Sequence, residues 1–473
     1  MRNPSNKARR RSPSTQALLD SLAREAEIDA ALEPHDEQAA GPAHDPGHMP
    51  EPDRSTPDEQ SAEGGVRFAC RYETTPRPDG GLTTRVLLEL EGAGVAAPRP
   101  VDLVLVVDRS GSMYGDRLEA AVAAGHHLID GLGDDCRVGI VTYESAVDVR
   151  APMQRLTGAG REALHAALDT IEVAGSTALA DGWCTGRDQL QAGVTDRLCR
   201  VLLLSDGLAN EGEQRVEVLG AWCREARDRG ITTSTVGIGE GYDEDLLRIM
   251  ATAGSGNSWY VPSPDAVAPV LEEERQSLTQ ISATGVRIHV EGREATLVRV
   301  LGSLEVGELA RGVPRALVFE FDVPAGRFPE LALGELLIEG YDLVLGGPFQ
   351  RRRGLLPTAR RGTVAEVRVA RLELTVAAVR DAAIAAADAR DYKGARALIS
   401  SVLVLLTVQS REVQARLTDQ VAALHRLDAL LDVRGYTPSV RKESLQRSEN
   451  LRTGKRRYEG ALDQWVRRPE SRS

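Results

Sequence analysis

Oxygen-bearing side chains stand at alternate positions directly after an apolar run in VDLVLVVDRSGSM, residues 101–113. Asp108, Ser110 and Ser112 alternate, so an extended loop could direct their three oxygens toward one point. Hard oxygen ligands of this kind suit Mg2+, Mn2+ or Ca2+ far better than they suit a soft metal. The segment therefore predicts a divalent-cation site rather than a nucleophile site.

The residues before Asp108 form the element that would position it. They are almost all apolar and mostly β-branched, which is typical of a strand buried on both faces of a parallel sheet. Such a strand would place Asp108 at its carboxyl end, the edge where open α/β sheets collect ligands. Strand and helix patterns alternate over the region that follows, and this predicts a doubly wound, mostly parallel α/β sheet.

Two further oxygens are predicted at the same edge of that sheet. Thr177 opens a helix after a Gly-Ser loop, and Asp206 follows the apolar run VLLLS. Two carboxylates would neutralise a divalent cation, while hydroxyls and waters would complete its coordination without adding charge. Such a site would favour one more anionic oxygen, for example a carboxylate from another molecule.

These motifs together resemble the von Willebrand factor type A (VWA) domain and its metal-ion-dependent adhesion site. The motifs are DxSxS beginning at Asp108, GST ending at Thr177, and SDG centred on Asp206. The resemblance implies that the hydroxyls of Ser110, Ser112 and Thr177 contact the metal. It implies that the two aspartates act directly or through water, and that a Glu or Asp of a partner completes the coordination.

Arg109 occupies a variable position inside the first motif. Its guanidinium could reach outward to a carboxylate of the partner or lie inert in solvent, and we expect the inert arrangement. A VWA fold with a vestigial, metal-free site is the alternative for the whole set. We favour a working site because all the motif positions carry oxygen-bearing side chains.

The composition bounds the class of protein. A chain of 473 residues predicts two or three domains, and its net charge of -12 argues against a protein that coats nucleic acid. Five scattered cysteines predict reduced thiols, and the basic start leads into no apolar signal region. No apolar run reaches membrane-spanning length, so we expect a cytoplasmic protein that has no contact with a membrane.

Composition and periodicity divide the chain into segments. We predict a disordered tail over 1–64, a β-hairpin over 65–98, a VWA domain over 99–275, the remainder of a β-sandwich over 280–355, a helical hairpin region over 362–432, and a basic tail over 433–473. The VWA domain would be inserted into, or followed by, the antiparallel β-sandwich. This plan loosely resembles bacterial VWA proteins in which a β module flanks the VWA domain.

Both ends of the chain leave alternatives open. Residues 14–32 could form a transient helix within the tail or a docking peptide for a partner. The basic tail could meet nucleic acid or an acidic partner, but we favour intramolecular docking or a solvated helix.

No catalytic assembly emerges from the sequence. Ser110 has no placed histidine, and the adjacent His126 and His127 do not share a helix face, which argues against a metal site made by those two. We therefore expect a non-enzymatic module in which a bound cation captures an exposed Asp or Glu of a protein partner. The resemblance suggests an AAA+ ATPase or a component of a conflict or stress system. A metal-assisted hydrolase is the alternative, and a surface adhesin would require export.

Overall fold

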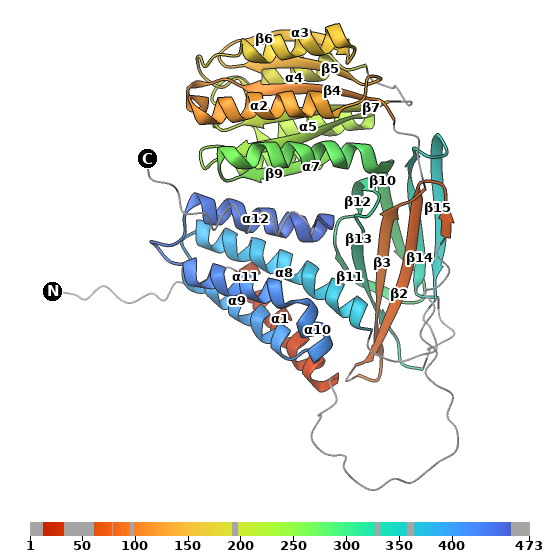
Figure 1. The fold of residues 1–473 in the computed structure, drawn as a ribbon. Coiled ribbons are helices and arrows are strands. Elements are labelled where there is room, and N and C mark those ends of the chain that lie inside the picture. Colours follow the sequence, from red (N-terminus) through yellow and green to blue (C-terminus); the bar gives the residue numbers. More distant parts are fainter. Residues whose placement is uncertain are drawn as a thin grey trace, which may run out of the picture.

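The computed structural model describes residues 13–32, 61–77, 79–94, 99–191, 197–326, 332–356 and 364–455. Most of the tail predicted to be disordered over 1–64 lies outside the described residues, as does the end of the basic tail after residue 455. Figure 1 shows three parts: an α/β domain, a pair of antiparallel sheets beside it, and a layer of helices below it. Of the described helices, none is both long and apolar enough to cross a membrane.

The α/β domain is built on one sheet of six strands in the order β6-β5-β4-β7-β8-β9. The strands are β4 Val101–Asp108, β5 Arg137–Tyr143, β6 Val147–Arg155, β7 Leu198–Ser205, β8 Ile231–Ile238 and β9 Ser255–Val261. All neighbours pair in parallel except β6, which lies antiparallel to β5 at the edge. The predicted doubly wound, mostly parallel sheet is confirmed.

Helices cover both faces of this sheet. Every residue of the central strand β4 is consequently buried. Leu105 and Val107 belong to the core under one set of helices, α2 Asp116–Gly131, α3 Gly158–Asp169 and α7 Val267–Gln280. Val104 and Val106 belong to the core on the other face, under α4 Leu179–Asp188, α5 Val216–Asp228 and α6 Glu244–Ala253. The alternation of side chains along the central strand therefore produces two apolar layers.

The antiparallel part consists of two sheets packed over a shared core. One has the order β1-β2-β3-β13-β11, with bounds Ser61–Glu63, Val66–Pro76, Leu82–Gly92, Arg315–Val323 and Thr296–Leu301. The other has the order β12-β10-β14-β15, with bounds Glu305–Ala310, Ile281–Gly292, Gly334–Asp342 and Gly347–Leu355. Strands β2 and β3 precede the α/β domain, and β3 pairs with β13, which follows it, so the α/β domain is inserted into the β-sandwich.

The exit from the α/β domain contains no linker. Helix α7 ends at Gln280 and strand β10 begins at Ile281. Strand β10 is then hydrogen-bonded on both sides, to β12 and to β14. The last helix of the inserted domain is thus continuous with an interior strand of the sandwich.

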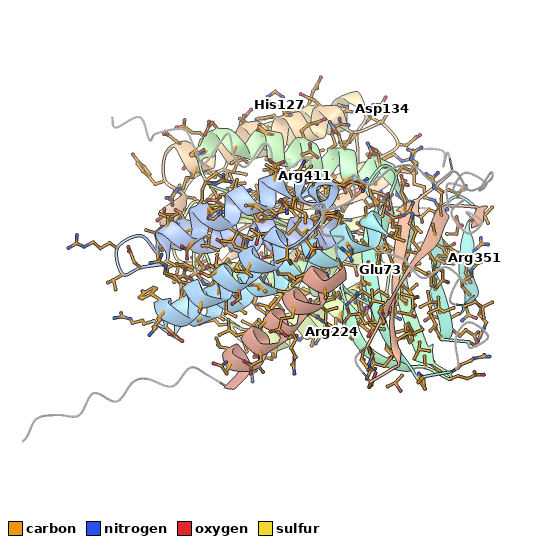
Figure 2. All side chains as sticks on the ribbon, turned by 90° about the horizontal axis from the view of Figure 1, so that it is seen from below. Glu73, His127, Asp134, Arg224, Arg351 and Arg411 are labelled. Carbon is orange, nitrogen blue, oxygen red and sulfur yellow. The ribbon has the colours of Figure 1, made fainter. Side chains whose placement is uncertain are left out.

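The remaining helices form a bundle with its own apolar core. They are α1 Pro13–Leu32, α8 Ala365–Asp388, α9 Tyr392–Thr407, α10 Arg411–Arg416, α11 Thr418–Leu430 and α12 Pro438–Thr453. The predicted helix break lies between α8 and α9, where the Asp391 carboxylate accepts a hydrogen bond from the Gly394 amide at 2.9 Å. Arg368 of α8 binds Glu73 of β2 at 2.8 Å, and Figure 2 shows Glu73 where the helices meet the strands.

Helix α1 corrects both alternatives that we considered for residues 14–32. It is neither left without tertiary contacts nor presented to another protein, because it packs on α9 of its own chain with Leu22 fully buried. Its Glu25 carboxylate lies 2.8 Å from the guanidinium of the buried Arg371, which also pairs with Asp29. The sequence pattern identified the apolar face of this helix but not the buried cation that its acidic residues meet.

Helix α12 holds the α/β domain against the bundle. The Lys442 ammonium donates to the Tyr242 carbonyl at 2.6 Å, and Arg441 pairs with Asp245 of α6 at 2.6 Å. On the other side of the helix, the Ser448 hydroxyl donates to the Ala377 carbonyl of α8 at 3.2 Å. Residues 438–453 of the predicted basic tail therefore dock within the chain.

A buried ion cluster joins the α/β domain to the sandwich. The Arg200 guanidinium on β7 contacts Glu274 of α7 at 2.5 Å and Glu308 of β12 at 2.6 Å, and Arg200 is almost fully buried. Burial acts to raise the pKa of Glu274, but Arg200 and hydrogen bonds outweigh it and hold that pKa below its ordinary 4.5. Since the folded-state pKa is lowered, this stabilisation is present above pH 4.5 and is lost as the pH falls further.

Replacing the cation of this cluster should destabilise the protein strongly. Arg200→Met would leave Glu274 and Glu308 buried without a countercharge, which costs about 3–5 kcal/mol of unfolding free energy. Urea unfolding at pH 7 measures the loss. Arg215→Met is the matched control, because Arg215 pairs with Glu213 at an exposed site and its loss should leave the urea midpoint nearly unchanged. Equal midpoints for the two variants would contradict the prediction.

Candidate metal centre

The carboxylate of Asp108 is fully buried at the carboxyl end of β4. One of its oxygens accepts from the Ser110 amide at 2.8 Å, and the other accepts from Ser205 Oγ at 2.9 Å and from Tyr143 OH at 3.3 Å. Burial raises the pKa of Asp108, and the charge of the nearby Asp206 adds to that rise against the effect of these hydrogen bonds. The group is therefore held in one orientation by donors from three strands or loops.

Ser110, Ser112 and Asp206 form a chain of contacting oxygens. The hydroxyls of Ser110 and Ser112 lie 3.2 Å apart, and Ser112 Oγ donates to Asp206 Oδ1 at 2.6 Å. Asp206 is fully buried and Ser110 nearly so, while Ser112 is exposed. One end of the cluster thus opens to solvent.

Thr177 reaches the same cluster from the loop before α4. A methyl group placed on Gly207 would lie 3.2 Å from Ser112 Oγ, 3.6 Å from Thr177 Oγ1 and 3.8 Å from Asp108 Oδ2. Three oxygens from two segments of the chain therefore lie within 4 Å of one point beside Gly207. The structure brings together all the side chains that the motifs singled out.

Arg109 departs from both roles that we considered for it. Its side chain is only 14% exposed, its Nη2 lies 3.2 Å from Glu144 Oε1, and its Nη1 donates to the Glu172 carbonyl at 3.2 Å. The Arg109 carbonyl also accepts from the Ala174 amide at 2.8 Å. Arg109 therefore neither points to a partner nor lies inert in solvent, because it ties the first motif to the loop that carries Thr177.

Several residues that support the cluster were missed from the sequence. Arg117, in the first turn of α2, donates to Asp206 Oδ2 at 2.6 Å and to the Ser112 carbonyl at 3.2 Å. Asn210 accepts from the Thr177 amide at 2.9 Å. A basic residue five positions after Ser112, at a helix start, was an available signal for Arg117. The roles of Tyr143 and Asn210 depend on the folded arrangement and left no local pattern.

The oxygen set fits a hard divalent cation. Mg2+ binds oxygens at about 2.0–2.1 Å in an octahedron, which places neighbouring ligands about 3 Å apart, close to the separation of the two serine hydroxyls. In the described part of the chain, no cluster of three or more His, Cys, Asp or Glu side chains could hold a metal. A metal site there must therefore draw on hydroxyls or water, and this cluster supplies three hydroxyls and two carboxylates.

Filling the space beside Gly207 should weaken cation binding without unfolding the chain. In Gly207→Ala the added methyl would press against Ser112 Oγ and stand between the three oxygens. We expect Mn2+ affinity to fall about 10- to 100-fold, the range for a disturbed ligand shell, in a calorimetric titration. Gly133→Ala is the control, because nothing lies within 4 Å of its added methyl. Equal affinity in both variants would show that the cation binds elsewhere.

Comparison with known proteins places the α/β domain in a family. The family model of the von Willebrand factor type A domain matches residues 102–273. The chain is similar to the protein YfbK of Escherichia coli, with 27% identity over 286 residues covering 56% of this chain and 49% of that protein. It is also similar to an uncharacterized protein of Synechocystis sp., with 28% identity over 193 residues, which cover 41% of this chain and 45% of that protein. The chain thus spans about half the length of these curated relatives.

A solved structure shares the fold over most of the chain. The von Willebrand factor type A protein from Catenulispora acidiphila aligns with a TM-score of 0.63 over 84% of this chain and 98% of that one. The aligned residues are 18% identical, so the likeness shows the fold alone. Because it covers far more than residues 102–273, it extends to the parts that flank the α/β domain.

Proposed function

Residues 102–273 form a von Willebrand factor type A domain, a metal-dependent protein-interaction module, and from this premise we propose that the chain binds a protein partner through a divalent cation held at Asp108, Ser110, Ser112, Thr177 and Asp206. The observation that carries the proposal is the convergence of these oxygens at one open edge of the sheet. Mg2+ is the cation that we propose, with Mn2+ or Ca2+ as substitutes.

The charge and exposure of the cluster support capture of an acidic side chain. Ser110, Ser112 and Thr177 would hold the cation, and Asp108 and Asp206 would balance its charge directly or through water. A cation bound there would supply an electrophilic position for one more carboxylate oxygen. Ser112 is exposed, so that position would face solvent and could receive an Asp or Glu of the partner.

Exposed apolar side chains flank the opening. Tyr114 is 82% exposed two residues after Ser112, and Leu208 is 58% exposed two residues after Asp206. Large exposed apolar residues beside a polar centre are typical of an interaction surface, where they exclude water around the central contact. We propose that the partner presents its carboxylate among apolar groups that pack on Tyr114 and Leu208.

The same contacts argue against the alternative of a metal-assisted hydrolase. Side chains that contact the two carboxylates within the described residues belong to Ser, Tyr and Arg, and none of them can serve as a general base in its ordinary ionisation state. A screen of phosphoesters and peptides with Mg2+ or Mn2+ tests this point. Metal-dependent turnover that Asp206→Ala abolishes would favour the hydrolase.

Removing the central carboxylate should abolish cation binding. Asp108→Ala takes away one of the two charges that balance the cation, so calorimetric titration with Mn2+ should show no binding at this site. The substitution leaves the buried hydroxyls of Ser205 and Tyr143 without this acceptor, so circular dichroism must first establish that the variant is folded. Asp116→Ala removes an equal charge from the exposed start of α2 and should bind Mn2+ as the wild type does. Equal Mn2+ binding by Asp108→Ala and wild type would end the metal assignment.

Partner binding should depend both on the cation and on the exposed apolar side chains of Tyr114 and Leu208. A pull-down with the full chain should retain a partner in Mg2+. The partner should be lost in EDTA, and it should not bind the Asp108→Ala variant. An AAA+ ATPase or a stress-system component would fit the family resemblance. The double variant Tyr114→Ser, Leu208→Ser should lower the affinity for the captured partner at least about tenfold. Its affinity for Mn2+ should stay unchanged. Leu345→Ser, at a 68% exposed position of the sandwich, is the control. A partner retained equally in EDTA would contradict the proposal.

A further inference from the structure

Two histidines from neighbouring helices meet on the outer side of the α/β domain. His126 of α2 and His165 of α3 place their Nδ1 atoms 2.5 Å apart. On the far side of each ring, His126 Nε2 lies 3.0 Å from Asp169 Oδ1 and His165 Nε2 lies 3.0 Å from Asp130 Oδ1. From the sequence we considered His126 only together with its neighbour His127. The actual partner comes from another helix.

The two rings face each other edge to edge. Their centroids lie 4.8 Å apart, which is the Nδ1–Nδ1 separation plus the radii of two five-membered rings, and their planes differ by 25°. The two Nδ1 atoms therefore lie close to the line between the ring centres. Each nitrogen consequently directs its in-plane lone pair, or its proton, at the other.

The acidic neighbours decide which nitrogen carries the proton. An ionised carboxylate can only accept hydrogen bonds, so Asp169 and Asp130 require Nε2–H on both rings. A neutral imidazole that carries its proton on Nε2 has a bare lone pair on Nδ1. Two bare lone pairs repel each other at this separation, and a cation between the rings, either a shared proton or a metal ion, would remove that repulsion.

We propose that His126 and His165 form a second metal site, which binds a borderline transition-metal ion such as Ni2+ or Zn2+ through the two Nδ1 atoms. Imidazole nitrogen suits these ions, whereas the oxygen cluster suits hard ions. A carboxylate that accepts from the distal N–H of each ligating histidine is the recurrent outer shell of such sites. Water would complete the coordination.

The surroundings allow the rings to open around an ion. Metal–nitrogen bonds of about 2.0–2.1 Å in a tetrahedral site need roughly 3.3 Å between the nitrogens, somewhat more than the present separation. Both imidazoles are 27% exposed, and the carboxylates of Asp169 and Asp130 are 67% and 61% exposed, so all four groups can shift.

The site is separate from the oxygen cluster. His126 lies ten residues into α2, about 15 Å along the helix axis from Asp116. A metal ion there would cross-link α2 to α3 over one face of the sheet. The proposed site therefore does not depend on the function proposed for the oxygen cluster.

Titration of the full chain with Ni2+ in excess Mg2+ tests the proposal. Wild type should bind one Ni2+ more than either His126→Gln or His165→Gln, and His127→Gln should match wild type. His127 is the control because it is exposed, as Figure 2 shows on α2, and makes no contact with the pair. The remaining histidines are present in wild type and in all three variants. The difference in the number of bound Ni2+ ions therefore reports on His126 and His165 alone.

Two further measurements make the outcome decisive. Asp169→Ala should weaken Ni2+ binding about tenfold, because the outer-shell acceptor of His126 Nε2 is lost. Melting temperatures without metal establish that each variant is folded, and Ni2+ should raise the melting temperature only in wild type and His127→Gln. Equal Ni2+ binding by wild type and His126→Gln would overturn the proposal and leave a shared proton between the rings.

Discussion

Two buried like charges at the end of one parallel sheet constrain the whole α/β domain. Asp108 and Asp206 lie at the ends of neighbouring strands and are fully buried, and burial followed by the charge of Asp206 raises the pKa of Asp108. Hydrogen bonds from Ser205, Tyr143 and the Ser110 amide offset part of that cost, and Arg117 offsets a further part. A divalent cation would offset the remaining cost of burying the two carboxylates. Two negative charges already balance such a cation, so further ligands should be neutral hydroxyls and not more carboxylates.

The rest of the molecule fixes the position of that sheet. Arg200 joins β7 to α7 through Glu274 and to the sandwich through Glu308, and α12 joins α6 to the bundle through paired charges. Buried ion pairs of this kind contribute modest net stability but impose a particular geometry, because each partner left alone would be a buried charge. Contacts with β12 and with α12 therefore fix the sheet relative to the sandwich and the bundle.

Local pattern predicted most of the fold and the residues of the candidate centre. The apolar run before Asp108 and the strand before Asp206 indicate their elements directly, and parallel strands must end at the same edge. The sequence did not predict the pairing of His126 with His165, the clamp made by Arg109, or the docking of α1 on Arg371. Each of these depends on which helices and loops become neighbours, and no periodicity along the chain encodes that.

The direct passage from α7 into β10 limits how the α/β domain can respond to a bound molecule. Sliding α7 along its axis would pull an interior strand out of register with β12 and β14 at once, and would break backbone hydrogen bonds on both of its sides. The proposed binding face would for this reason keep its shape when a partner binds, and binding would cost this chain little conformational entropy. Selectivity among partners would then come from the shape and charge of that face.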